Sequence, residues 1–182
     1  LQTAVVRAEA MGIPVLTVET TVTDQSYLTA HITGDNVDGG RRAAATLAEQ
    51  IGGSGKVFIM SGSPGATTNT LREEGFRSEL AANYPGVEIV GREYAMSQPA
   101  NATSAINTIL LKHPDLAGIF AIDGTSGTGA IAALRNNNAV GTVKLIGYDA
   151  YQVQVEALKE GVFSALLAQH PAGEADLATE SA

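Results

Sequence analysis

The stretch from Lys56 to Phe76, KVFIMSGSPGATTNTLREEGF, constrains the fold more than any other part of the sequence. It begins with an unbroken apolar run, continues through a loop rich in Gly, Pro and Thr, and ends in a helical pattern that carries Arg72. An apolar run without alternation is typical of a strand buried on both faces, and open α/β sheets bind ligands beside the loop that follows such a strand. Arg72 lies one helical turn past the loop, where its guanidinium can offer several donors to a bound molecule. We therefore expect a ligand cleft here.

The composition indicates a globular, acidic chain. Its 182 residues are 45% hydrophobic and 16% charged, and the formal net charge is -8. Because phosphate backbones are bound by clustered Lys and Arg, this charge opposes a nucleic-acid partner. No apolar run reaches the ~18 residues of a membrane helix, and no leader pattern opens the chain, so we expect no membrane insertion. The chain has no cysteine, and its three histidines show no metal-ligand spacing, so we expect no metal and no cofactor.

Apolar strand patterns alternate with helical patterns along the chain, which predicts an α/β fold. Strands are expected at residues 15–18, 30–33, 56–61, 87–94, 116–122, 143–148 and 162–168. Helices are expected at residues 1–11, 38–51, 68–83, 100–112, 127–137, 152–160 and 173–182. Strands separated by helices of this length imply a doubly wound parallel sheet, with helices on both faces.

Both ends of the sequence look cut. The first helical pattern starts at Leu1 without a Ser, Thr, Asp or Asn before it, and the last pattern stops without a Gly or Pro terminator. We expect the chain to be incomplete at both ends. Fraying at natural termini is the alternative.

Six short motifs follow one another along the chain. They are Gly12 to Val15 (GIPV), Gly34 to Asn36 with Gly39 and Gly40, Gly62 to Gly65 (GSPG) with Arg72 to Phe76 (REEGF), His113 to Asp115 (HPD), Phe120 to Asp123 (FAID) and Gly147 to Asp149 (GYD). In this order and spacing they resemble the ribose/galactose-type periplasmic binding proteins over nearly the whole chain. The same superfamily includes the effector-binding cores of the lac-repressor family.

The resemblance implies a periplasmic-binding-protein-like fold of type I, in which two flavodoxin-like lobes are joined by a hinge and a sugar binds between them. Residues 1–34 would then be the end of the first lobe, residues 35–169 a nearly complete second lobe, and residues 170–182 a recrossing segment and the start of a first-lobe helix. It also implies a receptor, not an enzyme, that delivers a monosaccharide or polyol to the permease of an ABC transporter. Such a protein is exported to the periplasm or the cell exterior, and its signal peptide is not present in this chain.

Three residues carry the chemistry that a buried sugar requires. Each sugar hydroxyl both donates and accepts, so a site needs ionised carboxylates and a planar cation with several donors. Arg72, Asp123 and Asp149 fit this need, because both acids follow apolar strands at the edge where the cleft is expected. The alternatives are structural: each Asp could cap the helix that follows it, and Arg72 could be a surface residue paired with Glu73.

Four further residues are assigned to the site by the resemblance. Gln169 matches a position that reaches the sugar near the recrossing point, although it could be an ordinary polar residue at a strand end. Glu19 and Thr20 stand where ribose binders have Asp-Arg, so an acid is kept and a cation is lost. Ser97, next to Met96, stands where those proteins supply an aromatic ring, which packs on the C–H face of a sugar. These departures disfavour ribose and favour another sugar, a polyol or another small polar ligand.

Two other functions stay open at this point. An enzyme with a phosphorylated cofactor could use Gly124 to Gly129, GTSGTG, as a phosphate-binding loop between a strand and a helix, although the offsets are not those of a G-x-G-x-x-G fingerprint. A repressor or sensor core of the same superfamily would carry a DNA-binding or signalling domain outside this chain. The loop from Ser63 to Asn69 resembles transport receptors more than repressors.

Overall fold

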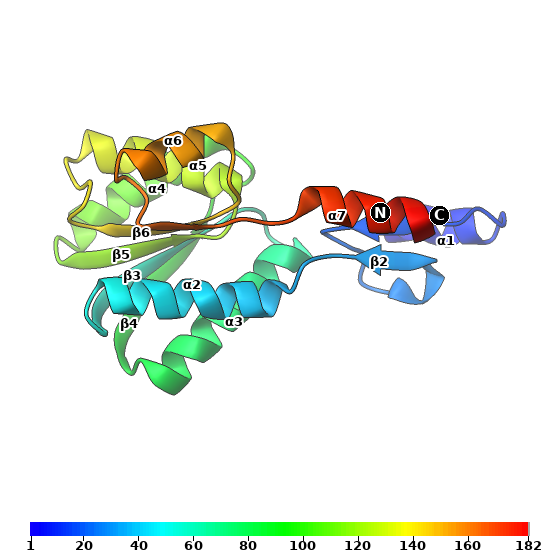
Figure 1. Ribbon diagram of the computed structural model, residues 1–182, viewed down its shortest axis with the longest axis horizontal. Helices are drawn as coiled ribbons and strands as arrows, with labels where there is room; N and C mark the ends of the chain where they lie inside the picture. Colours follow the sequence, from blue (N-terminus) through cyan, green and yellow to red (C-terminus); the bar gives the residue numbers. More distant parts are fainter. Residues whose placement is uncertain (182) are drawn as a thin grey trace.

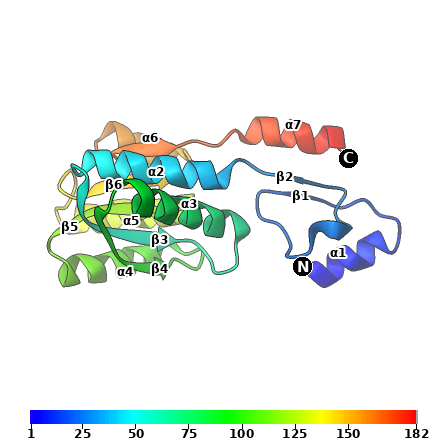
Figure 2. The same ribbon diagram turned by 90° about the horizontal axis from the view of Figure 1, so that it is seen from below.

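The computed structural model describes residues 1–181, which form a large lobe and a small lobe (Figure 1). The large lobe contains β3 (Ser54–Ser61), β4 (Gly86–Tyr94), β5 (Leu116–Ala121), β6 (Lys144–Tyr148) and β7 (Ala165–Leu167), with α2 (Asn36–Gln50), α3 (Thr67–Asn83), α4 (Pro99–Lys112), α5 (Gly124–Asn136) and α6 (Gln152–Lys159). The small lobe contains α1 (Gln2–Glu9), β1 (Leu16–Val18), the 3-10 helix η1 (Gln25–Tyr27), β2 (Ala30–Ile32) and α7 (Pro171–Ser181). The chain passes between the lobes twice, from β2 to α2 and from β7 to α7 (Figures 1 and 2).

All five strands of the large sheet are parallel and lie in the order β4-β3-β5-β6-β7. Helices α4, α5 and α6 cover one face of this sheet, and α2 and α3 cover the other (Figure 1). The predicted doubly wound parallel α/β fold is therefore confirmed. The strand order reverses direction between β3 and β5, and in open α/β sheets ligands bind at such a point, beside the carboxyl ends of the strands.

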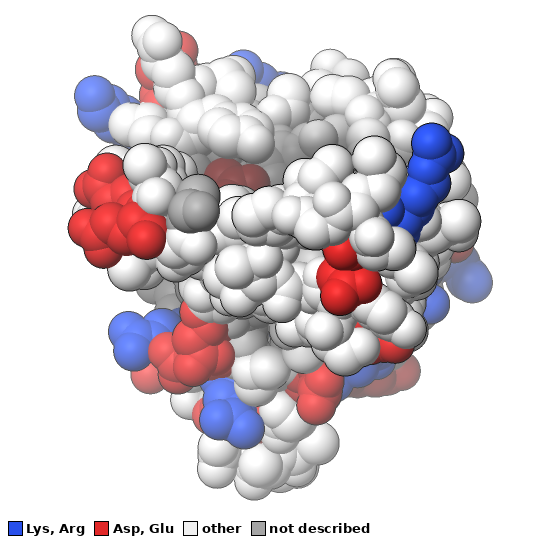
Figure 3. Space-filling model, turned by 90° about the vertical axis from the view of Figure 1, so that its right-hand side faces the viewer, with Lys and Arg blue, Asp and Glu red and all other residues white. Residues whose placement is uncertain are grey.

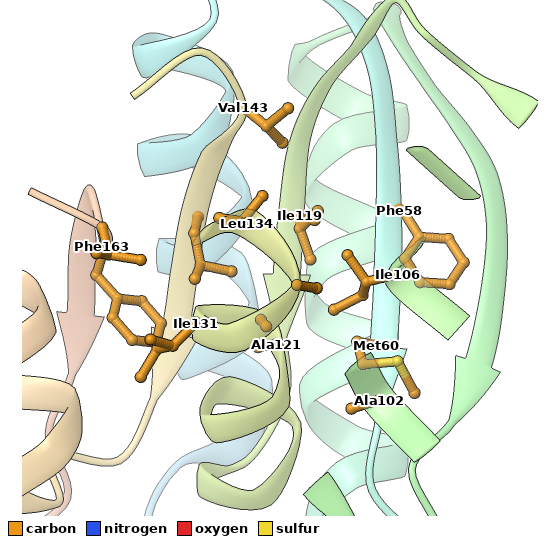
Figure 4. Close-up of a cluster of buried hydrophobic side chains, with 14 of the residues drawn as sticks. Phe58, Met60, Ala102, Ile106, Ile119, Ala121, Ile131, Leu134, Val143 and Phe163 are labelled. Carbon is orange, nitrogen blue, oxygen red and sulfur yellow. The ribbon is translucent and has the colours of Figure 1, made fainter. Parts of the chain in front are cut away.

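The buried strand β3 explains the unbroken apolar run in the sequence. Alternate side chains of a strand point to opposite faces, and here both faces are covered. Phe58 and Met60 pack into the core under α4 and α5, which is drawn in Figure 4. Val57 and Ile59 pack into the core on the other face, under α2 and α3. Each side chain from Val57 to Met60 therefore lies in one of the two apolar cores, which explains why the apolar run is unbroken.

Two glycines let α2 and α3 approach each other closely enough to fix the position of Arg72. A Cβ atom on Gly40 of α2 would lie 2.0 Å from the backbone oxygen of Arg72. A Cβ atom on Gly75 of α3 would lie 2.0 Å from the backbone oxygen of Val37. Any larger residue at either position would push the helices apart, because real Cβ atoms do not approach backbone atoms so closely.

The structure corrects the sequence analysis at two elements of the large lobe. Helix α5 begins at Gly124 and not at residue 127, so the segment from Gly124 to Gly129 is helical and is not a loop. Strand β7 is limited to Ala165–Leu167, whereas a strand over residues 162–168 was expected. Val162 and Phe163 instead bury their side chains in the core beneath α5 and α6. The expected terminal helix begins at Pro171, and residue 182 lies outside the described residues.

The small lobe has few buried residues and exposes several large hydrophobic side chains. Among its large hydrophobic side chains, those of Leu1, Met11, Ile13, Val18 and Leu177 are exposed. Figure 3 views the molecule from the small-lobe end and shows that most of the middle of this face belongs to uncharged residues. Within the described part of the chain, no helix is both long and apolar enough to cross a membrane.

Candidate functional site

The seven residues assigned to the site from the sequence line one cavity of about 350 Å³ between the lobes, which lies within the usual size range of small-molecule sites. They are Glu19, Thr20, Arg72, Ser97, Asp123, Asp149 and Gln169. All except Arg72 follow the carboxyl end of a strand: β1 for Glu19 and Thr20, β4 for Ser97, β5 for Asp123, β6 for Asp149 and β7 for Gln169. Strands β4, β5, β6 and β7 are parallel members of one sheet, so their carboxyl ends meet at one edge, and the end of β1 in the separate two-stranded sheet faces this edge across the cavity. Their role in ligand binding stays a prediction.

Arg72 is the central cation of the cavity. Its side chain is almost fully buried, with a residue exposure of 2%, so it is not the surface residue considered as an alternative. Its Nε donates to Oδ1 of Asn36 at 2.7 Å, and its Nη1 donates to the backbone oxygen of Ile122 at 3.2 Å. Its Nη2 donates to Glu19 Oε2 at 3.2 Å and to Gln169 Oε1 at 3.1 Å. The guanidinium thereby has acceptors in both lobes and at one crossing between them.

The aromatic ring of Tyr148 stacks against the guanidinium of Arg72. The Cζ atom of Arg72 lies 3.7 Å from the centroid of the Tyr148 ring, a stacked cation–π arrangement. The tyrosine hydroxyl fits against Gly39, where a Cβ atom would lie 2.0 Å from it. Helix α2 thus shapes the site through both Asn36 and Gly39.

The two aspartates are fixed by backbone donors. Asp123 is the N-cap of α5: its Oδ1 accepts from the backbone N–H of Ser126 at 2.8 Å, and its Oδ2 accepts from Asn69 Nδ2 at 3.1 Å. Asp149 does not cap α6, whose N-cap is Tyr151. Its Oδ2 accepts from the backbone N–H of Gly124 at 2.8 Å, and its Oδ1 accepts from Nε2 of Gln169. Both carboxylates therefore lie at the N-terminus of α5, where the helix dipole favours negative charge.

Three of the seven residues have a left-handed backbone, which is uncommon outside glycine. The φ angles are 66° at Glu19, 56° at Ser97 and 72° at Asp149. Such a conformation costs roughly 1–3 kcal/mol per residue and is concentrated at binding and catalytic sites. Glu19 and Asp149 each directly follow the last residue of a strand. The left-handed conformation there turns the chain and aims the carboxylate at the cavity.

Glu19 has an unusual electrostatic environment. Burial of the carboxyl and, after it, the neighbouring carboxyl of Glu174 on α7 together raise the pKa of Glu19 to about 7. Arg72 opposes this effect and Asp149 adds to it weakly. The Oε1 atom of Glu19 is buried and has no hydrogen-bond partner among the described residues.

The sequence analysis missed several residues that surround the site. Asn69 and Tyr151 line the cavity, Asn36 orients Arg72, and Glu174 faces Glu19. Asn69 precedes Arg72 by three residues on α3, a spacing that places both on one helix face and could have identified it. No sequence signal connects Glu174 to Glu19, because their proximity depends on how α7 packs against β1.

The described residues contain no cluster of three or more His, Asp or Glu side chains arranged to hold a metal ion. The GTSGTG segment, considered as a phosphate loop, lies inside α5, and the first N–H of that helix donates to Asp149. A phosphate there would meet the Asp149 carboxylate, so the arrangement does not fit an anionic cofactor.

Comparison with known proteins identifies the family. The sequence profile described as "Periplasmic binding protein domain" matches residues 1–182. The chain belongs to this family. The resemblance seen in the short motifs and the expected type I fold are therefore confirmed.

Individual members of the periplasmic binding protein family are also similar to this chain. The ribose import binding protein of Bacillus subtilis (strain 168) is 30% identical over 182 residues, which are 100% of this chain and 58% of that protein. A solved ABC transporter solute binding protein from Agrobacterium vitis, bound with alpha-D-tagatopyranose, has a TM-score of 0.89 and 33% identity over 94% of this chain and 60% of its own. One from Actinobacillus succinogenes with bound D-allose has a TM-score of 0.88 and 30% identity, covering 98% and 65% of the two chains. The chain thus spans less than two thirds of the length of these relatives.

Proposed function

We propose that this chain forms part of a solute receptor that binds a monosaccharide or a similar small polyhydroxylated ligand between its lobes. The receptor would deliver the ligand to the permease of an ABC transporter and would act in the periplasm or outside the cell. Relatives described as import binding proteins for ribose and as transporter proteins with bound tagatose or allose support this proposal.

The observation that carries the proposal is the convergence of Arg72, Asp123 and Asp149 on one cavity. Each is held by protein groups on one side and lines the cavity on the other, so its position is fixed before a ligand arrives. Preorganised charged groups of this kind suit a ligand whose hydroxyls both donate and accept. Hydrogen bonds to charged groups contribute roughly 1.5–3 kcal/mol each, so three such residues would supply much of the ~8 kcal/mol of micromolar binding.

The lobe arrangement supports a closing mechanism. We infer crossings between the lobes near residues 34–35 and 169–170, with residues 1–34 and 170–182 in one lobe and residues 35–169 in the other. Glu19 and Thr20 would contact the ligand from one lobe, while Arg72, Ser97, Asp123 and Asp149 would contact it from the other, and Gln169 would lie at the crossing. A ligand that touches both sides stabilises the closed form by its differential affinity, and the closed surface signals the bound cargo to a permease.

We infer that the receptor has no catalytic activity. The carboxylates of Asp123 and Asp149 accept hydrogen bonds from backbone N–H groups and so serve as fixed hydrogen-bond acceptors in the cavity. Binding and release, without covalent chemistry, are sufficient for the proposed role.

Calorimetric titration of the purified protein with pentoses, hexoses and polyols tests the proposal. We expect saturable heat with at least one of them, and its loss in Asp149→Ala. The matched control is Asp176→Ala, an exposed acid on α7 outside the cavity, which is expected to bind as the unaltered protein does. Absence of heat with every member of the panel would favour a repressor or sensor core with a different effector.

A further inference from the structure

The cavity carries an excess of negative charge. A second cavity of about 310 Å³ adjoins the first and shares Glu19, Asp149, Tyr151 and Gln169 with it, and its wall also includes Glu174. The described residues that line the two cavities include four carboxylates and one guanidinium, which gives a formal charge of -3. The carboxylates are those of Glu19, Asp123, Asp149 and Glu174, and the guanidinium is that of Arg72.

Arg72 does not balance this charge. All of its hydrogen bonds within the structure go to protein acceptors, and only Glu19 Oε2 among them is a carboxylate oxygen. The two aspartates receive neutral N–H donors. A ligand that brought no positive charge would leave the excess in place.

The excess negative charge of the cavities is concentrated between Glu19 and Glu174. Glu19 Oε1 is buried without a hydrogen-bond partner among the described residues, and Glu174 is the carboxylate beside it. Two facing carboxylates can be reconciled either by a proton or by a cation between them, and the raised pKa of Glu19 reflects the first solution. An ammonium group has three donors and no acceptor, so it can satisfy both carboxylates at once.

We propose that the ligand is a polyhydroxylated amine, such as an amino sugar or an aminopolyol, whose ammonium group binds between Glu19 and Glu174. Its hydroxyls would bind Arg72, Asp123 and Asp149, so this inference rests on the proposed function and names the ligand class for the same site. Tyr151 lines both cavities and is 57% exposed, which leaves its ring free to attract the cation. Sugar phosphates and uronic acids are repelled by the same charges.

Matched ligand pairs test the proposal by calorimetry at pH 7. Each pair differs in one group: galactosamine and galactose, glucosamine and glucose, and 1-amino-1-deoxysorbitol and sorbitol, with glucuronate as the anionic probe. We expect at least one amine to bind about tenfold or more tightly than its hydroxyl partner, because a charged hydrogen bond is worth that factor. Glucuronate is expected to bind more weakly than glucose.

Variants locate the ammonium site. Glu174→Gln is expected to lower the affinity for the preferred amine about tenfold and to leave that of its neutral partner within about twofold. The matched control is Glu180→Gln on the exposed part of the same helix, which is expected to change neither affinity. Thermal unfolding of both variants checks that the fold is kept.

The outcomes separate this inference from the function on which it rests. Neutral sugars that bind as tightly as their amines would overturn the inference and leave the proposed function standing. An amine preference that persists unchanged in Glu174→Gln would overturn the assigned position. Binding of neither class would overturn both proposals.

Discussion

Arg72 of α3 donates from Nη2 to Glu19 Oε2 at 3.2 Å, so the central cation of the large lobe is paired with an acid of the small lobe. The same nitrogen donates to Gln169, which lies where the chain leaves β7 for α7. One guanidinium therefore connects the cavity, the facing lobe and one of the two crossings. Its loss is expected to affect both stability and binding.

Replacement of Arg72 by Met is expected to lower the free energy of unfolding by about 3 kcal/mol, because it leaves buried acceptors on Asn36 and Ile122 unpaired. Urea denaturation measures the change. Arg77→Met is the matched control: Arg77 lies on the same helix and pairs with Glu73 at the surface, so a loss of about 0.5 kcal/mol or less is expected. Equal losses in the two variants would show that the buried hydrogen bonds of Arg72 contribute no more to stability than the surface ion pair of Arg77.

Two substitutions at Asp123 separate its role as a helix cap from its proposed role in binding. Asp123→Asn keeps an oxygen for the N–H of Ser126, so the free energy of unfolding is expected to stay within about 0.5 kcal/mol. Asp123→Ala removes the cap and is expected to cost about 1–2 kcal/mol. Calorimetry should nevertheless find ligand affinity about tenfold lower in Asp123→Asn, because the charged acceptor is lost. Unchanged ligand affinity in Asp123→Asn would mean that Asp123 serves only as the N-cap of α5.

The raised pKa of Glu19 predicts that its contribution to stability falls as pH rises. The carboxyl has an ordinary pKa of 4.5 in the unfolded chain and a pKa of about 7 in the folded protein, where Glu174 and Asp149 face it together with Arg72. Below pH 4.5 it is protonated in both states and its contribution is fully present. Between pH 4.5 and 7 the unfolded chain loses the proton first, so stability falls, and above pH 7 the contribution is lost.

The expected loss is about 1 kcal/mol, after allowance for solvent screening of a partly exposed side chain. It is measured as the difference in free energy of unfolding between the unaltered protein and Glu19→Gln from pH 4.5 to 8. Glu180→Gln should follow the unaltered protein throughout. Parallel pH profiles for the unaltered protein and Glu19→Gln would rule out the raised pKa.

Gly40→Ala is expected to destabilise the protein by about 3 kcal/mol or more, because the added methyl group would meet the backbone oxygen of Arg72 at 2.0 Å. Thermal and urea unfolding measure the loss. In the control Gly91→Ala, the methyl group would lie 3.6 Å from the Phe58 ring, an ordinary contact, so stability is expected to be unchanged or up to about 1 kcal/mol higher. Similar values for both variants would mean that the helix contact can relax.

Patterns within single segments predicted much of the fold. The unbroken run at Val57 to Met60 required a strand covered on both faces, and both cores are present. Helix α5 was expected to begin at residue 127, but it begins at Gly124, directly after its N-cap Asp123. A Cβ atom on Gly129 would lie 2.4 Å from the backbone oxygen of Pro99, so close packing against α4 selects glycine there. Such a requirement is invisible until the helices are placed.

The residues of the candidate site were likewise predictable from the sequence only in part. Asp123 and Asp149 could be predicted, because an acid directly after a buried parallel strand must lie at the sheet edge. The partners of Arg72 could not, since Asn36 and Tyr148 reach it from other elements. Glu174 could not be predicted for the same reason. Its neighbour Glu19 lies near the opposite end of the chain, and the two residues meet only because α7 packs beside β1.

The position of the bound ligand tests the account most directly. Amide NMR spectra of the protein, recorded during titration with the tightest ligand of the calorimetric panels, locate the residues that respond. We expect the largest shifts at the amides of Gly124, Asp149 and Gln169, with none at the cavity lined by Phe58, Val90 and Lys112 between α4 and β4. Shifts centred on that other cavity, or spread over the surface without a maximum beside Arg72, would contradict the account.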